Sequence, residues 1–232
     1  MDLLWDGIRQ ALLLIWQRDP EVLGIMWVSL QLSGLATALA LLVGVPIGSL
    51  LALQRFPGRS LLVSLANAGM GLPPVVVGLF VAISFWRSGP LGGLDLLYTP
   101  TAVVIAQFLI ALPVVTALTL AAVQQVDPNL RLQMLALGAS TRQWITVVLW
   151  EAKLPMVAAV IAAFGAVISE VGAVMMVGGN LAGSTRVLTT ATVLETRRGN
   201  FEVAIALSVI LLGIAFLVTW LLTWVQQREA SR

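Results

Sequence analysis

The amino-acid sequence predicts an all-α integral membrane protein with five transmembrane helices, preceded by a short interfacial helix. Apolar residues make up 59% of the 232-residue chain and charged residues only 10%, whereas a soluble domain averages roughly 25% charged residues. Four long windows contain no charged side chain and a fifth contains one. Each window exceeds the ~20 residues that a helix needs to cross a bilayer. The spans are expected to be helical, because lipid offers no partners for backbone N–H and C=O groups.

The composition excludes several kinds of functional site. The chain has no cysteine and no histidine, so it lacks both thiolate chemistry and the commonest metal ligand. The formal net charge is only +2 and no dense basic run is present, which gives no sign of a nucleic-acid partner. We therefore expect no catalytic residue, no metal, no cofactor and no nucleic acid. Membrane lipid is the partner that composition alone predicts.

The first element is expected over residues 1–20. Its apolar side chains recur at helical spacing, and its polar side chains lie elsewhere around the turn. This pattern predicts an interfacial helix that lies on the membrane or against the helix bundle. A frayed first turn of the bundle is the alternative. The apolar set is Leu3, Leu4, Ile8, Leu12 and Ile15.

A transmembrane domain is expected over residues 21–228. Proline and glycine occur inside several of its spans, where neighbouring helices can take up the freed backbone groups. Pro73 and Pro74 are expected to kink the second span. The charge distribution places the spans at about 27–54, 62–85, 99–123, 154–178 and 203–226.

Glu170 is the only charged residue between Leu154 and Thr185. A charge at the centre of a membrane helix costs about 2.5–3.5 kcal/mol on insertion scales, so it should face the bundle interior or water. One interpretation is that Glu170 sets or gates a translocation path. The other is a structural knot near a helix break, in which Glu170 bonds to backbone N–H or hydroxyl groups, such as Ser169 of a neighbouring subunit.

The segment 128–145, between the third and fourth spans, has the pattern of two short helices. Asp127 and Pro128 form a helix start, Gly138 is a typical helix end, and Ser140 or Thr141 can cap a second helix. The sequence therefore predicts a helix–Gly–helix hairpin in the interface, with apolar side chains that can enter a groove on a partner protein.

The stretch "LALGASTRQWITVV" in this hairpin resembles the coupling-helix signature of type I ABC importer permeases. The signature is an "EAA" triplet followed by Gly, a small residue, Ser and an aromatic residue. Its second half is matched, whereas Leu132, Gln133 and Met134 stand where the triplet begins. The resemblance implies the type I permease fold, with ATPase coupling through Leu135, Leu137, Gly138, Ala139, Ser140, Arg142 and Trp144.

The stretch "ISEVGAVMMVGGNLAGSTRVLTTATVLETRRGNFE", residues 168–202, resembles the membrane subunit of tungstate ABC importers. Molybdate and sulfate permeases match this stretch less closely, so molybdate and sulfate are the alternative substrates. The resemblance implies a homodimer that works with a separate ATP-binding subunit and a periplasmic or lipid-anchored substrate-binding protein. It also implies a bacterial or archaeal plasma (inner) membrane, with the N-terminus outside and the C-terminus cytoplasmic. The chain contains no phosphate-binding loop for ATP, so it is not expected to be an enzyme.

The Gly-rich stretch "VGGNLAGSTRVLTT" is a candidate for the outer gate. Such a loop leaves backbone N–H groups free for a tetrahedral dianion, and Arg186 adds attraction. A plain exposed loop, with Ser184 or Thr185 capping the next helix, is the alternative.

Two other functions are alternatives to an ABC permease. One is a secondary transporter that uses Glu170, and the other is a membrane scaffold that transports nothing. Residues assigned to the path or gate are Pro73, Pro74, Glu170, Gly172, Asn180, Ser184, Thr185 and Arg186, with Thr189 and Thr190 as further gate candidates.

Overall fold

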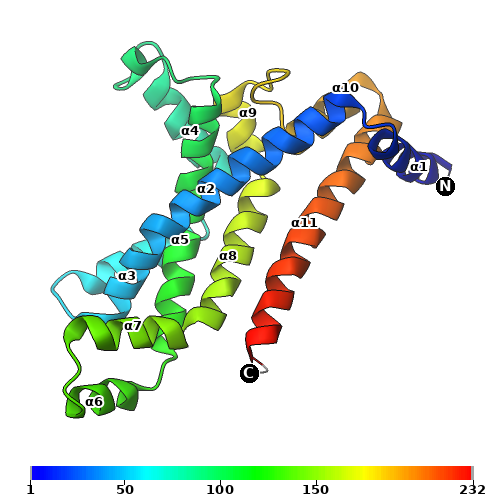
Figure 1. Cartoon of the computed structure of the whole chain (residues 1–232). Coiled ribbons are helices and arrows are strands. Elements are labelled where there is room, and N and C mark those ends of the chain that lie inside the picture. The colour runs from blue at the N-terminus through cyan, green and yellow to red at the C-terminus, as the bar shows by residue number, and fades with distance from the viewer. Residues whose placement is uncertain (1, 231–232) are drawn as a thin grey trace.

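The computed structural model describes residues 2–230, and within that range every regular element is a helix (Figure 1). The hydrophobic windows of the sequence become the long helices, because only a helix pairs its backbone groups within one segment. In chain order the elements are α1 (Asp2–Trp16), α2 (Pro20–Leu53), α3 (Arg59–Gly69), α4 (Pro74–Phe85), the 3-10 turn η1 (Gly92–Leu94), α5 (Pro100–Gln124), α6 (Pro128–Ala136), α7 (Thr141–Glu151), α8 (Lys153–Ile168), α9 (Gly172–Gly178), α10 (Leu188–Arg198) and α11 (Phe201–Ala230).

Three described helices, α2, α5 and α11, are individually long and apolar enough to cross a membrane, and there are up to five spans if each bent helix pair counts as one. Helix α2 begins at Pro20, before the expected start near 27, because Asp19 caps it. The Asp19 carboxylate accepts hydrogen bonds from the backbone N–H groups of Glu21 and Val22, both at 3.0 Å.

Helices α2 and α5 form the centre of the molecule. A Cβ on Gly48 would lie 2.5 Å from the carbonyl oxygen of Thr116, so only glycine allows this approach.

The second span is broken rather than merely kinked. Helices α3 and α4 meet at 103°, and Pro73 between them has an extended backbone with ψ of 120°. Pro74 takes the first position of α4, where its missing N–H costs nothing. The residue before a proline is driven away from the helical region, so Pro73 cannot continue α3. The single helix expected over 62–85 is therefore two helices.

The fourth span is also interrupted. The continuous helix expected over 154–178 is α8 and α9, separated at Ser169, Glu170 and Val171. The span is also preceded directly by α7, which meets α8 at 63°. Consequently the second short helix of the hairpin extends to Glu151, further than the expected boundary at 145.

Helix α1 is complete from Asp2 to Trp16 and lies against the start of α11 (Figure 1). A Cβ on Gly7 would lie 2.4 Å from Ile205 Cγ2, and Ala11 is buried. The opposite side of α1 is apolar and exposed, as Trp5 shows with 72% of its surface accessible. The helix therefore has one face on the bundle and an apolar face turned outwards.

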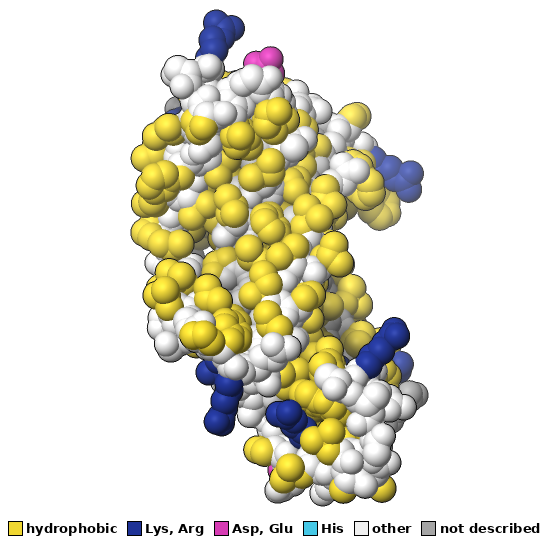
Figure 2. Space-filling model, turned by 90° about the vertical axis from the view of Figure 1, so that its left-hand side faces the viewer, with side chains coloured by type: hydrophobic (Ala, Val, Ile, Leu, Met, Phe, Trp, Pro, Cys, Tyr) yellow, Lys and Arg dark blue, Asp and Glu magenta, His cyan; other side chains and the backbone are white. Residues whose placement is uncertain are grey.

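The hairpin of α6 and α7 lies at one end of the molecule, and the loop between α9 and α10 lies at the other (Figure 1). Apolar side chains cover most of the face between these ends in Figure 2, as expected for a surface in contact with lipid. The two candidate sites of the sequence analysis are thus at opposite ends of the spans.

Candidate functional site

The hairpin is fixed by local hydrogen bonds at both of its turns. The Asp127 carboxylate caps α6 by accepting from the N–H of Asn129 at 2.9 Å. Gly138 has φ of +79°, a left-handed conformation that glycine adopts freely. Ser140, rather than Thr141, caps α7 in a reciprocal pair with Gln143, whose side-chain oxygen accepts from the Ser140 N–H at 2.8 Å. The expected helix–Gly–helix arrangement is confirmed.

The residues that resemble a coupling signature lie on two sides of this hairpin. Leu137 is 84% exposed and lines a groove between α6 and α7, together with Gly138, Ala139 and Arg142. A second groove, between the hairpin and the ends of α2 and α5, contains Leu135 and Trp144. Of the seven expected residues, four thus line the first groove and two line the second, while Ser140 is the cap of α7.

Trp144 does not project as an apolar knob towards a partner. Its side chain is only 6% exposed and belongs to a buried cluster with Val123 and Val148. The guanidinium carbon of Arg131 lies 4.7 Å from the centre of its ring, which is the geometry of a cation–π contact. Trp144 thus anchors the hairpin to α5, and the sequence could not distinguish this inward position from an outward one.

Glu170 closes the break between α8 and α9. Its carboxylate accepts a hydrogen bond from the N–H of Ala173 at 2.9 Å, and its carbonyl oxygen accepts from the hydroxyl of Thr189 at 2.8 Å. The hydroxyl of Ser169 instead donates to the carbonyl of Gly165 at 2.7 Å. The bond from the Ala173 N–H matches the interpretation of a structural knot, whereas the Thr189 hydroxyl binds the backbone of Glu170 and not its carboxylate.

The breaks in the second and fourth spans lie next to each other. A Cβ on Gly172 would be 2.5 Å from Val75 Cγ2, and a Cβ on Gly78 would be 2.5 Å from the Cα of Ala173. The first turns of α4 and α9 therefore touch. A groove beside the first break is lined by Gly69, Met70, Gly71, Leu72, Pro73 and Pro74.

The loop after α9 satisfies its own backbone groups. The N–H groups of Ser184, Thr185 and Arg186 all donate to the carbonyl of Leu181, at 3.2, 3.0 and 2.9 Å. The buried hydroxyl of Thr185 accepts from the Leu181 N–H at 3.0 Å and donates to the carbonyl of Gly178. The expectation of a loop with free N–H groups is therefore wrong for these positions.

Helix α10 is capped without Ser184 or Thr185, so that expectation is also wrong. Its N-cap residue is Val187, whose N–H donates to the hydroxyl of Thr190 at 3.1 Å. The N–H of Leu188 donates to the hydroxyl of Ser29 in α2 at 2.8 Å. These bonds tie the start of α10 to the centre of the bundle.

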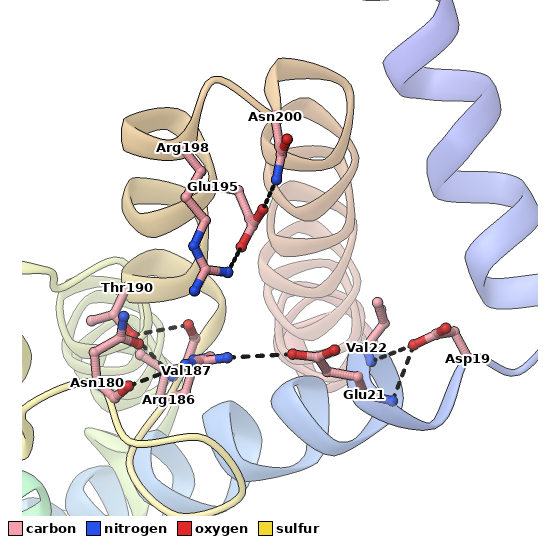
Figure 3. A network of polar contacts seen from close by, with 10 residues as sticks. All are labelled: Asp19, Glu21, Val22, Asn180, Arg186, Val187, Thr190, Glu195, Arg198 and Asn200. Atoms are coloured by element: carbon pink, nitrogen blue, oxygen red, sulfur yellow. Dashed lines mark hydrogen bonds and ion pairs between the residues drawn. The ribbon is translucent and has the colours of Figure 1, made fainter.

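Arg186 connects the loop to the start of α2 (Figure 3). Its guanidinium lies 3.3 Å from a carboxylate oxygen of Glu21 and donates to the carbonyl of Asn180 at 3.5 Å. The Arg186 side chain is 16% exposed and that of Glu21 is 73% exposed. Asn180 has a left-handed backbone with φ of +54°. The charge of Arg186 is therefore largely covered and partly balanced by Glu21.

Glu195 at the end of α10 forms the other polar cluster in Figure 3. A hydrogen bond from the Asn200 amide at 2.7 Å lowers the pKa of its carboxyl group, and the Arg198 guanidinium at 2.8 Å lowers it further. Among the side chains of residues 3–228, no group of three or more acidic, histidine or cysteine residues is placed to hold a metal ion.

Gln107 is a buried polar residue that the sequence analysis missed. It is 1% exposed, and its amide nitrogen donates to the carbonyl of Val167 at 2.9 Å and to the hydroxyl of Ser33 at 3.3 Å. It therefore holds the end of α8 against α2. The sequence could have identified Gln107, because it is the only polar side chain in the apolar stretch 102–115.

Comparisons with known proteins connect this geometry to a family. A family model described as "Binding-protein-dependent transport system inner membrane component" matches residues 44–231. A probable anion ABC transporter permease protein of Haloferax volcanii is 44% identical over 81% of this chain and 83% of the relative. The tungstate uptake system permease protein TupB of Peptoclostridium acidaminophilum is 38% identical over 94% and 96%. The molybdenum transport permease ModB of Escherichia coli is 28% identical over 92% and 98%.

Solved structures share the fold at low sequence identity. The MetNI methionine ABC transporter, in an inward-facing conformation, matches with a TM-score of 0.66 and 19% identity, over 93% of this chain and 95% of that one. A bacterial ABC transporter involved in alginate import matches with a TM-score of 0.71 and 18% identity, over 89% and 79%.

Proposed function

Because this chain belongs to the family of binding-protein-dependent transport system inner membrane components, we propose that it is the permease subunit of an ATP-driven importer for tungstate. It is a multi-pass plasma-membrane protein and not itself an enzyme, and it works with an ATP-binding subunit and a substrate-binding protein. Tungstate is supported by relatives at 38% and 33% identity, against 28% for a molybdenum permease and 26% for a sulfate permease. Molybdate and sulfate are the alternatives within the same group.

The observation that carries the proposal is the exposed tip of the hairpin. Leu137 is 84% exposed, although the Asp127 and Ser140 caps hold the backbone on both sides of it. A rigid segment with an exposed apolar side chain and an adjoining groove is typical of a protein-binding site. The ATP-binding subunit is the partner that fits this place, and Arg142 in the same groove can bind its acidic side chains.

The orientation follows from where the chain ends lie relative to the hairpin. The side chain of Gln226, near the end of α11, donates to the carbonyl of Leu154 at 3.0 Å, so the end of α11 is on the hairpin side. Helix α1 lies at the opposite end (Figure 1). A cytoplasmic hairpin therefore means a cytoplasmic C-terminus and an external N-terminus.

The translocation path is proposed to form between two copies of this chain, at the adjacent breaks of the second and fourth spans. Pro73 and Pro74 line a groove beside the break in the second span. Gly172 allows the break in the fourth span to lie against it. In this proposal Glu170 keeps the break folded and binds no anion, because its carboxylate caps α9 and would repel a dianion. The same contact gives no support to a secondary transporter that uses Glu170.

The outer end of the path is proposed to be the loop from Asn180 to Arg186. Thr185 is fully buried, so it shapes the loop rather than touching the anion. Ser184 is partly exposed and Arg186 carries the only positive charge between Lys153 and Arg197. These two residues remain the candidates for contact with the anion or with the substrate-binding protein.

The proposal is tested by reconstituting the chain with its ATP-binding subunit and substrate-binding protein in lipid. ATP hydrolysis is then measured with tungstate, molybdate and sulfate. Stimulation by tungstate at the lowest concentration is the expected result. Equal hydrolysis with and without any of the anions would contradict an oxyanion importer, and a preference for molybdate or sulfate would contradict tungstate as the substrate.

A further inference from the structure

A pocket on the hairpin side of the molecule collects three arginines from different parts of the chain. Arg55 and Arg59 follow the end of α2, and Arg131 comes from α6. The walls between them are mostly apolar and come from α2, α5, α6 and α7, with Leu53 and Leu132 among them. In Figure 2 several basic side chains lie on the lower part of the drawn face, towards the end of the molecule that holds the hairpin.

Two of the three guanidinium groups are held in place by the protein. The Nε of Arg59 donates to the carbonyl of Leu51 at 2.6 Å, at the end of α2. The guanidinium of Arg131 lies 4.7 Å from the centre of the Trp144 ring, and Trp144 is itself buried. Both contacts fix an arginine without neutralising it, so its remaining N–H groups can bind an anion.

The acidic side chain of the pocket does not balance its three arginines. None of the three arginines forms an ion pair with a side chain of residues 3–228. The pocket contains one acidic residue, Asp127, and its carboxylate accepts from the Asn129 N–H as the cap of α6. Three guanidinium groups against one carboxylate leave the pocket with an excess of positive charge.

We propose that this pocket binds the phosphate of an anionic phospholipid. Arginine forks match phosphate oxygens, and basic pockets beside membrane helices are suited to anionic headgroups. The apolar walls favour a lipid over a free dianion, because a lipid has acyl chains that can pack against them and a free dianion has no apolar group. Exposed leucines of α3, Leu61, Leu62 and Leu65, continue from Arg59 and offer a surface for an acyl chain.

The lipid site does not depend on which anion is transported. The proposed orientation places it in the cytoplasmic leaflet, where anionic lipids create a negative surface. Because the pocket shares Trp144 and Leu135 with the hairpin, a bound lipid would stabilise the hairpin position against α5. The site thus couples the lipid composition to the segment that is proposed to contact the ATPase.

The test is native mass spectrometry of the purified chain, titrated with phosphatidylglycerol, phosphatidylcholine or inorganic phosphate. Retention of phosphatidylglycerol is expected, and Arg55→Gln and Arg59→Gln should each weaken it about fivefold, as expected for one arginine at an anionic lipid. Arg55 has no hydrogen bond or ion pair in the described chain, so its variant tests charge even if Arg59→Gln folds poorly. Arg87→Gln, at the other end of the molecule, is the charge-matched control and should bind normally.

Four results would overturn the proposal. Equal retention of phosphatidylcholine would remove the role of the headgroup charge, and unchanged phosphatidylglycerol binding in both pocket variants would place the lipid elsewhere. Binding of inorganic phosphate without binding of phosphatidylglycerol would make this a site for a free anion. When the same variants are purified together with the ATP-binding subunit, loss of that subunit with lipid binding intact would assign the arginines to that protein.

Discussion

A Cβ atom on Gly172 would lie 2.5 Å from Val75 Cγ2, so the first turns of α9 and α4 are in direct contact. This contact joins two helix breaks that are almost 100 residues apart in the sequence. The proposed path depends on that junction, because each break is stabilised by the helix beside it.

The first prediction concerns the glycine one turn into α4. A Cβ on Gly78 would be 2.5 Å from the Cα of Ala173, which is backbone and cannot rotate away. Gly78→Ala is therefore expected to destabilise the protein by about 1–3 kcal/mol, as overpacking does. Thermal unfolding of the detergent-purified chain measures this change. Gly165→Ala is the matched control, because a Cβ there meets nothing within 4 Å, and it should be neutral or stabilising by up to about 1 kcal/mol.

The second prediction separates the charge of Glu170 from its hydrogen bond. In Glu170→Gln the amide oxygen can still accept from Ala173 N–H, so stability and tungstate uptake should both persist. In Glu170→Leu that donor is left unpaired, at a cost of about 1–3 kcal/mol. Uptake assays and thermal unfolding of both variants give the answer. Loss of uptake in Glu170→Gln with an unchanged unfolding temperature would show that the charge itself acts in transport.

The third prediction concerns Arg186 at the outer loop. Arg186→Ala should lower uptake at limiting tungstate by about fivefold, which corresponds to roughly 1 kcal/mol of lost charge attraction. Glu21→Gln is the control, because it removes the ion-pair partner at 3.3 Å and leaves the positive charge in place. Its uptake should be at least that of the unmodified chain. Identical uptake kinetics for Arg186→Ala would exclude a role for this charge.

The fourth prediction is a pH dependence at the end of α10. Asn200 and Arg198 lower the pKa of Glu195 in the folded protein. A lowered folded-state pKa contributes stability above the unfolded-state pKa, and that contribution disappears as the pH falls through the folded-state value. The protection of the amides of residues 195–200 from hydrogen exchange, expressed relative to the intrinsic exchange rate at each pH, should therefore fall on acidification below pH ~4. Glu195→Gln should lose this acid response, at a cost at neutral pH of less than about 1 kcal/mol; an acid response that persists in this variant would assign it to another group.

The hairpin could be predicted from the sequence because its signals are local. Asp127, Gly138 and Ser140 each act on a neighbour within five residues, and the structure has each in its expected place. The inward position of Trp144 depended instead on Val123, which belongs to another helix. An exposed and a buried aromatic residue have the same helical spacing, so periodicity could not decide between them.

The break in the fourth span entered the sequence analysis only through one of the two interpretations of Glu170, and the span itself was expected as one continuous helix, because the partners that stabilise the break are distant. The residues from Leu154 to Val177 are apolar almost throughout, which is the pattern of one continuous helix. The interruption is stabilised instead by the Thr189 hydroxyl and by contact with Val75. The loop after α9 escaped prediction for a similar reason. Its glycines suggested free N–H groups, but the Thr185 hydroxyl reaches back to the carbonyl of Gly178 and closes the loop on itself.

The position of the hairpin tip is the central claim, and a single cysteine tests it most directly. The chain has no cysteine of its own, so Leu137→Cys provides one reactive thiol at an 84% exposed position. In intact cells a membrane-impermeant maleimide should not label it, whereas Ser88→Cys at the opposite end should be labelled. After permeabilisation the Leu137→Cys thiol should react, and bound ATP-binding subunit should protect it. Labelling of Leu137→Cys from outside intact cells would contradict the account.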